Sequence, residues 1–267
     1  MLKDIYPGSD SSAPRMLTGL DSRFFALANS PQGFELWVTE GTAASTRRVK
    51  RLSNQLSGRA ERHAFMFKDR VFFSFPTPVS ELSSEEPGYE LWVTDGTTTG
   101  TQKLAKFPTG TVEGFTVFRD RLFFSGGGAD GQELWSSDGT PQGTKQVVDL
   151  APGSQLIAPP CLPPSPQNPT PNCPPPFEQQ HSSAPQELAA QGDWLYFVAW
   201  GLPGGRSLYR TDGTGQGTER IKRFQTDSLQ FQHLFKLNQN LIVLIEVLPK
   251  ESEAQTGASR LQIWSLP

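Results

Sequence analysis

The stretch YELWVTDGTTTGT at residues 89–101 decides the fold, because related copies of it recur along the chain. Three further copies are FELWVTEGTAAST at 34–46, QELWSSDGTPQGT at 132–144 and RSLYRTDGTGQGT at 206–218. A fifth, LQIWSLP at 261–267, matches only the first half of the motif. A motif repeated at such intervals is typical of propellers and other repeat folds.

Each copy of the motif belongs to a unit of four short strands. An apolar run such as LFF at 122–124 precedes the motif, another apolar segment lies upstream, and an alternating segment follows. Short strands separated by turn residues predict an all-β fold, and four strands in about 40–55 residues fit a propeller blade. We therefore predict a single five-bladed β-propeller domain over residues 1–267. Its four-stranded blades are expected at about 14–52, 63–108, 111–150, 185–225 and 228–266.

The two ends of the chain are predicted to meet. The last unit has only three strands, and MLKDIYPG at 1–8 resembles the end of a unit, VVDLAPG at 147–153. We expect residues 1–6 to supply the missing strand of the blade at 228–266. Such pairing would close the ring and remove an open sheet edge.

The copy ELWVTDGTTTGT resembles the ELWxxDGT repeat family of bacterial proteins, and the resemblance covers nearly the whole chain outside an insertion at 153–184. The fourth copy departs from the pattern with Ser207 and Tyr209, and the first copy has Glu40 in place of Asp. The resemblance implies a propeller-like repeat fold in a secreted or surface-exposed bacterial protein. It implies no activity and supplies no catalytic residues.

The recurring residues of the motif are interpreted as structural. The aromatic residue is expected to pack between adjacent blades, the alternative being a ring of ligand-stacking aromatics. The acidic residue before Gly-Thr is expected to accept hydrogen bonds within a tight turn. Calcium binding at this turn is the alternative, but the spacing lacks the several oxygen ligands of a calcium loop. The glutamate that opens the motif is expected to pair with a basic residue on the next strand. The aromatic residues are Trp37, Trp92, Trp135, Tyr209 and Trp264, the acidic ones are Asp95, Asp138 and Asp212 with Glu40, and the glutamates are Glu35, Glu90 and Glu133.

The insertion at 153–184 is rich in proline and should be extended. It contains both cysteines of the chain, Cys161 and Cys173, which we predict to form a disulfide. A metal site is disfavoured because only His181 is nearby and zinc takes four ligands, so we predict no metal and no cofactor. A disulfide indicates an oxidising compartment and thus an extracellular, periplasmic or cell-surface protein.

Bulk composition excludes two classes of partner. No stretch approaches the roughly 20 apolar residues that span a bilayer, so no membrane span is predicted. The net charge of −3 argues against binding to nucleic acid.

Variation in loop length is predicted to fall on one face of the propeller, which is where binding residues concentrate. The main prediction is a non-catalytic binding or structural interaction module, not an enzyme, which presents this loop-rich face to a protein or glycan partner or serves as a subunit of a larger surface assembly. Candidate binding residues are Trp200, Arg59, Glu85 and Lys250.

The alternative prediction is a glycoside-active enzyme with a site in the central channel. Glycoside chemistry requires two or three carboxylates in that channel. Glu113 and Glu187 lie near the starts of two expected inner strands and are the candidates. The chain's histidines, His63, His181 and His233, are scattered in the sequence, and no residue is assigned as catalytic.

Overall fold

The structure is a computed structural model that describes residues 2–54, 63–77, 88–158, 175–201, 205–224, 229–237, 240–247 and 260–266. All the regular elements of these residues are β-strands, which confirms the all-β prediction. No described segment forms a helix long and apolar enough to cross a membrane.

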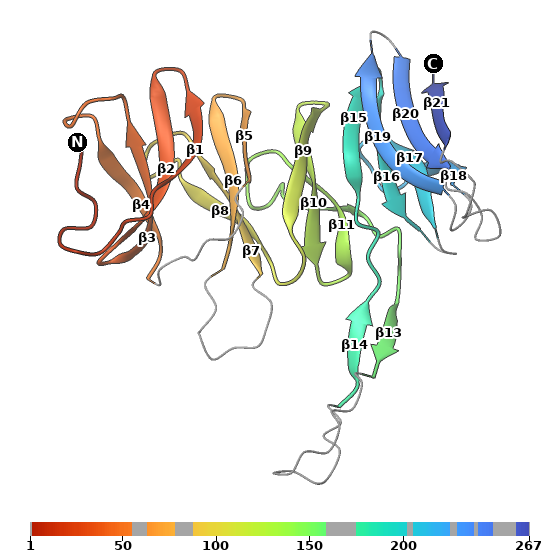
Figure 1. The fold of residues 1–267 in the computed structure, drawn as a ribbon, viewed down its shortest axis with the longest axis horizontal. Coiled ribbons are helices and arrows are strands. Elements are labelled where there is room, and N and C mark those ends of the chain that lie inside the picture. Colours follow the sequence, from red (N-terminus) through yellow and green to blue (C-terminus); the bar gives the residue numbers. More distant parts are fainter. Residues whose placement is uncertain are drawn as a thin grey trace.

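The described strands form six antiparallel sheets (Figure 1). The first sheet contains β1 (Arg15–Leu20), β2 (Arg23–Ser30), β3 (Gly33–Thr39) and β4 (Arg47–Ser53). The second contains β5 (His63–Phe67), β6 (Arg70–Pro76), β7 (Tyr89–Thr94) and β8 (Gln102–Phe107). The third contains β9 (Val112–Phe118), β10 (Arg121–Gly128), β11 (Gly131–Ser137) and β12 (Lys145–Val148). The fourth contains β15 (Gln186–Gln191), β16 (Trp194–Trp200), β17 (Arg206–Thr211) and β18 (Thr218–Arg223). The fifth contains β19 (Leu229–Leu237), β20 (Asn240–Val247) and β21 (Arg260–Leu266), and a small hairpin contains β13 (Ser154–Ile157) and β14 (Phe177–Gln180).

The first four of the larger sheets follow one another in chain order along the long axis, and the fifth overlaps the fourth at the right-hand end of Figure 1. Their first strands contact each other in the sequence β1, β5, β9, β15 and β19, so each sheet contributes its first strand to an inner row. Strands that meander outward from an inner strand are the arrangement of propeller blades. The structure is therefore of the propeller type.

Paired phenylalanines hold neighbouring sheets together. Successive side chains of a strand point to opposite faces, so the two members of a pair pack on different neighbours. Phe73 of β6 lies in the apolar cluster with the first sheet, whereas Phe72 lies in the cluster with the third. Phe124 and Phe123 of β10 divide in the same way between the second and fourth sheets. Each buried phenylalanine contributes about 1.5–3 kcal/mol of burial free energy, which explains why the doublets recur.

The predicted closure by residues 1–6 is not formed in the structure. Residues 2–14 contain no strand, and β20 is the only described strand that pairs with β21. The backbone N–H of Asn29 donates to the carbonyl of Ser12 at 2.8 Å, which fixes the segment beside the first sheet. The sheet of β19, β20 and β21 lies at the other end of the row (Figure 1). The N-terminal segment is thus positioned to continue into β1 rather than to pair with β21.

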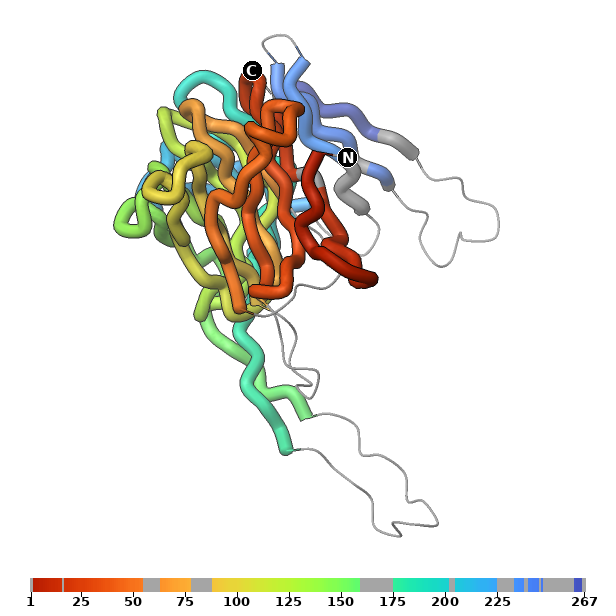
Figure 2. The backbone as a smooth tube through the Cα atoms, turned by 90° about the vertical axis from the view of Figure 1, so that its left-hand side faces the viewer, coloured from red at the N-terminus to blue at the C-terminus, as the bar shows by residue number. Residues whose placement is uncertain are grey.

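The insertion begins and ends as a hairpin that projects from the row of sheets (Figure 2). Strands β13 and β14 pair from Ser154 opposite Gln180 to Ile157 opposite Phe177. We call this hairpin the arm. Cys161 and Cys173 lie outside the described residues, and their disulfide stays a prediction.

Candidate functional site

The inner strands are irregular where candidate catalytic residues occur. In β9, Gly114 and Phe115 oppose a single residue of β10, and in β15, Glu187 and Leu188 oppose a single residue of β16. The first residue of each bulge has a positive φ, +71° for Gly114 and +55° for Glu187. Glycine is the usual residue at such a position, because a side chain there is strained. Glu187 therefore occupies a position for which the equivalent bulge uses glycine.

The two bulges lie against each other. The hydroxyl of Thr116 on β9 donates to the carbonyl of Leu188 on β15 at 3.1 Å. A Cβ atom built on Gly114 would be 3.8 Å from the Leu188 side chain. Glu113 and Glu187, the two carboxylates nominated from the sequence, thus come from adjacent inner strands and each lies at the start of a bulge or next to it.

Glu187 also faces the following inner strand. Its Oε1 atom lies 3.5 Å from Nδ1 of His233 on β19, with 36% of the Glu187 side chain and 64% of the His233 side chain exposed. Both groups can therefore be reached by a ligand from solvent. On the other side, Glu113 is half-buried and accepts a hydrogen bond of 2.9 Å from the hydroxyl of Thr111.

We give the name inner-strand cluster to Glu113, Glu187 and His233, which come from the inner strands β9, β15 and β19 and of which Glu187 and His233 are in direct contact. Sequence reasoning named the two glutamates but treated His233 as isolated. The missed signal is positional, because the three residues lie on the inner strands β9, β15 and β19, and β15 contacts both of the others. Within the described residues, no group of three or more His, Cys, Asp or Glu side chains is arranged to hold a metal ion.

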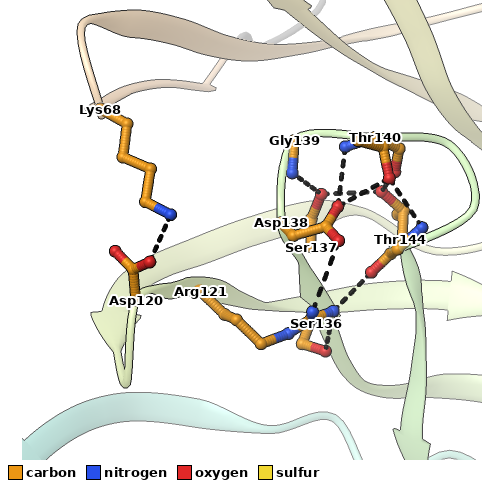
Figure 3. A network of polar contacts seen from close by, with 10 residues as sticks. Lys68, Asp120, Arg121, Ser136, Ser137, Asp138, Gly139, Thr140 and Thr144 are labelled. Atoms are coloured by element: carbon orange, nitrogen blue, oxygen red, sulfur yellow. Dashed lines mark hydrogen bonds and ion pairs between the residues drawn. The ribbon is translucent and has the colours of Figure 1, made fainter.

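The Asp-Gly-Thr turns form a second set of polar contacts, shown for one copy in Figure 3. Oδ1 of Asp138 accepts hydrogen bonds from the backbone N–H and the hydroxyl of Thr140, at 2.9 and 2.8 Å. Partial burial acts to raise the pKa of Asp138, but the hydrogen bonds from Thr140 and the charge of Arg121 outweigh it, and the pKa lies below its usual value. The same bonds join Asp95 to Thr97 and Asp212 to Thr214.

The first copy builds this turn differently. Its acidic residue is Glu40, and the hydroxyl of Ser45 accepts the backbone N–H bonds of Glu40 and Thr42 at 3.1 and 3.2 Å. Ser45 stands where the third copy has Gly143, whose Cβ would lie 2.0 Å from the Asp138 carboxylate. A hydroxyl therefore replaces the carboxylate, and the glycine is not required.

The motif glutamates connect strands within a sheet. Glu35 accepts from Arg48 at 2.9 Å and from the indole N–H of Trp37 at 3.2 Å. Glu90 accepts in the same way from Lys103 at 2.6 Å and Trp92 at 2.9 Å. In these two copies the glutamate pairs with a basic residue of the following strand and fixes the indole ring.

Glu133, the third motif glutamate, has different partners. Its carboxylate accepts from the backbone N–H and hydroxyl of Ser183, at 2.9 and 2.5 Å, and from the N–H of Leu150 at 3.2 Å. The buried indole N–H of Trp135 consequently has no hydrogen-bond partner. Burial raises the pKa of Glu133 to about 7, despite the donors from Ser183 and Leu150. Glu133 thus connects Ser183, near the end of the insertion, and Leu150, three residues before its start, to the third sheet.

The motif aromatics are not equally buried. Trp92 and Tyr209 are buried, and Trp135 packs edge-on against Phe107 of the second sheet with ring centroids 5.0 Å apart. Trp264 is 38% exposed and lies under Lys222. Trp37 has an intermediate exposure.

Trp200 lines a cleft at the base of the arm. The cleft has a volume of about 330 Å³, and Trp200 is 46% exposed. The other binding residues predicted from the sequence, Arg59, Glu85 and Lys250, lie outside the described residues.

Comparisons with known proteins concern the fold. No family model and no curated protein sequence matches the chain. An exo-β-1,3-galactanase from Phanerochaete chrysosporium is 9% identical over 97% of this chain, with a TM-score of 0.37. An α-L-arabinanase from Cellvibrio cellulosa is 11% identical over 97% of this chain and 92% of its own, with a TM-score of 0.32. The propeller domain of the Trilobed protease from Pyrococcus furiosus is 12% identical over 94% of this chain and 66% of its own, with a TM-score of 0.44. This chain spans 61% of the galactanase chain.

The prediction of a non-catalytic interaction module is corrected by these comparisons. Glycoside hydrolases recur among the solved structures with this architecture, and they agree with the alternative prediction instead. The prediction that the protein is not an enzyme is dropped with it. The likeness itself concerns the fold, and the chemistry depends on this chain's own residues.

Proposed function

We propose that this protein acts on glycosidic bonds and that the inner-strand cluster of Glu113, Glu187 and His233 is its active site. The observation that carries the proposal is the backbone of Glu187, which is the one of the eight described non-glycine residues with a positive φ that lies inside a strand. A non-glycine residue in the left-handed region costs on the order of 1–3 kcal/mol, and such strain persists mainly where a side chain is needed in that place. The equivalent bulge in β9 avoids the strain with Gly114.

The cluster supplies the groups that glycoside hydrolysis requires. One carboxyl donates a proton to the leaving oxygen, while the other activates water or attacks the sugar carbon. Glu113 and Glu187 are the two carboxyl groups. His233, 3.5 Å from Glu187, is a positioning residue that fixes the carboxylate.

Four further proposals accompany this one. The five larger sheets are the five blades of one propeller, and the repeats belong to the ELWxxDGT kind. The protein acts outside the cytoplasm, as the predicted disulfide between Cys161 and Cys173 requires. Its substrate is a glycan that reaches the inner strands from the face that carries the arm.

The test is hydrolysis of neutral polysaccharides, with β-1,3-galactan and arabinan as the first substrates. Release of reducing ends should fall at least a hundredfold in Glu113→Gln and in Glu187→Gln. The matched control is Glu178→Gln on the arm, which should keep the parent rate because Glu178 is exposed and bonded only locally to Ser154. Hydrolysis that both inner-strand variants retain would refute the assignment.

A second variant separates function from folding. Glu187→Gly should relieve the left-handed strain and raise the free energy of unfolding by about 1 kcal/mol, while hydrolysis is lost. Gain of stability with loss of activity is the pattern of a residue kept for function. A Glu187→Gly variant that is less stable than the parent would show that the side chain is structural.

A further inference from the structure

The cleft at the base of the arm lies between the arm, the end of β16 and Ala151, which follows β12 in the chain. It is lined by residues from both sides of the insertion and from the end of β16, among them Gln155, Gln179, His181, Ser182 and Trp200. The backbone N–H of Trp200 donates to the carbonyl of Ser183 at 2.7 Å, which joins β16 to the returning end of the arm. Glu133 holds the same residue, Ser183, so both walls of the cleft are fixed to the sheets.

The lining indicates the charge of the ligand. Its side chains are amides, an imidazole, a hydroxyl and an indole, and no Asp, Glu, Lys or Arg is among the described residues that line it. The guanidinium of Arg206 lies over the Trp200 ring but is not among the lining residues, and it is bonded to Gln186. Amide and hydroxyl groups both donate and accept, which suits an uncharged ligand with many hydroxyl groups.

The amides are arranged as a pair. Gln155 and Gln179 are directly opposite each other on β13 and β14, and the Gln155 NH₂ group donates to the Gln179 carbonyl at 3.4 Å. This contact uses neither the Gln155 carbonyl nor the Gln179 NH₂ group. One acceptor and one donor are therefore side by side and available to two adjacent hydroxyl groups of a ligand.

Two exposed aromatic rings flank the amide pair. Trp200 is at the sheet end of the cleft, where the guanidinium of Arg206 lies 5.6 Å from its ring centroid. Phe177, 51% exposed, is further out on the arm. Phe177 and Gln179 are two residues apart on β14, so they share a face and are separated by about 6.6 Å along the strand. From the fourth sheet outward, the order is Trp200 of β16, the amide pair and Phe177; Trp200 and the amides line the cleft, and Phe177 lies beyond it on the arm.

The cleft is joined to the inner-strand cluster. Arg206, which lies over Trp200, donates to the side-chain carbonyl of Gln186 at 3.3 Å. Gln186 is the residue before Glu187 on β15. Arg206 and Gln186 thus connect the cleft with the strand that carries Glu187.

We propose that this cleft is a binding subsite for a neutral oligosaccharide, whose sugar rings stack on Trp200 and Phe177 and whose hydroxyl groups bond to Gln155 and Gln179. The inference deepens the proposed function, on which its role as a substrate subsite rests. The arm holds the chain of sugars, and the inner-strand cluster acts on its end. Uncharged sugars are selected because the lining carries no fixed charge.

The test measures binding separately from hydrolysis. The double variant Glu113→Gln/Glu187→Gln of the full chain is titrated calorimetrically with the hexasaccharides of β-1,3-galactan, arabinan and laminarin, and with hexagalacturonate as the charged probe. At least one neutral hexasaccharide should bind, and hexagalacturonate should bind at least tenfold more weakly. Adding Trp200→Ala should weaken binding about tenfold or more, the effect of losing roughly 1.4 kcal/mol of contact free energy. Trp200→Phe should restore most of it.

The matched control is Trp264→Ala, since Trp264 is also a partly exposed indole beneath a cation but is on the fifth sheet. It should leave binding unchanged. Absence of binding by all three neutral probes, tighter binding of hexagalacturonate, or equal loss in Trp264→Ala would overturn the subsite. Binding that depends on Trp200 in a parent chain that hydrolyses nothing supports the subsite and refutes the proposed function. If Trp200→Ala leaves both hydrolysis and affinity unchanged, the proposed function is supported and the subsite is refuted.

Discussion

Replacement of Glu133 by glutamine should make the protein's stability less dependent on pH. Burial raises the pKa of Glu133 from 4.5 to about 7 in the folded chain. The folded state thus favours the protonated carboxyl. Its contribution is fully present below the unfolded pKa and is lost as the pH rises through the folded pKa. Integrated from pH 5 to pH 8, the loss is about 2.5 kcal/mol, an order-of-magnitude figure.

The assay is urea unfolding of the parent and of Glu133→Gln at pH 5, 6.5 and 8. Glutamine is neutral throughout and can still accept one of the bonds from Ser183 or Leu150. The free energy of unfolding of the parent should fall by about 2.5 kcal/mol more than that of the variant between pH 5 and pH 8. Glu178→Gln, which removes an exposed carboxylate, controls for net charge. Parallel pH profiles for the parent and Glu133→Gln would refute the reasoning.

Three further predictions concern the turns, the N-terminus and the insertion. Asp138→Ala should lower the free energy of unfolding by about 1–2 kcal/mol in urea melts, because two hydrogen bonds of the turn are lost, and an unchanged midpoint would contradict this. Deletion of residues 1–8 should change the free energy of unfolding by less than about 1 kcal/mol, since residues 2–8 form no strand, and a collapse in solubility would instead support pairing with β21. Cys161 and Cys173 should be unreactive to a thiol reagent in denatured, unreduced protein from an oxidising compartment, and two titratable thiols would exclude the disulfide.

The sequence predicts the sheets well because their determinants are local. A phenylalanine doublet such as Phe72-Phe73 needs an apolar neighbour on each face, and Asp138-Gly139 makes its own turn through bonds to Thr140. These features recur in several repeats, so the strands and turns predicted for one copy support those predicted for the others. The propeller-type order of the sheets follows from them.

What the sequence cannot predict depends on contacts between distant segments. The partner of Glu133 is Ser183, fifty residues away on the far side of the insertion, whereas the repeat suggests a basic residue on the next strand. The nearness of Glu187 and His233 depends on how β15 meets β19. The predicted closure assumed that a sequence resembling a fourth strand would occupy that place. In the structure, the hydrogen bond from the Asn29 N–H to the Ser12 carbonyl instead keeps the N-terminal segment beside β2.

Glu133 binds Ser183 and Leu150 instead of a basic residue and an indole. This difference indicates what moving the arm to another sheet would require. An insertion after β8 in the second sheet would meet Glu90, whose carboxylate is already bound to Lys103 and Trp92. In a chimeric protein, the Glu90 carboxylate would have to lose a present partner, for instance through Lys103→Gln. The inserted arm would also need a serine equivalent to Ser183 at its end. The host repeat would then lose the bond to its own indole, as Trp135 has. The glutamate of each repeat can thus bind either the indole of its own tryptophan or a long inserted segment. A propeller of this kind therefore has as many possible attachment points for an insertion as it has motif glutamates.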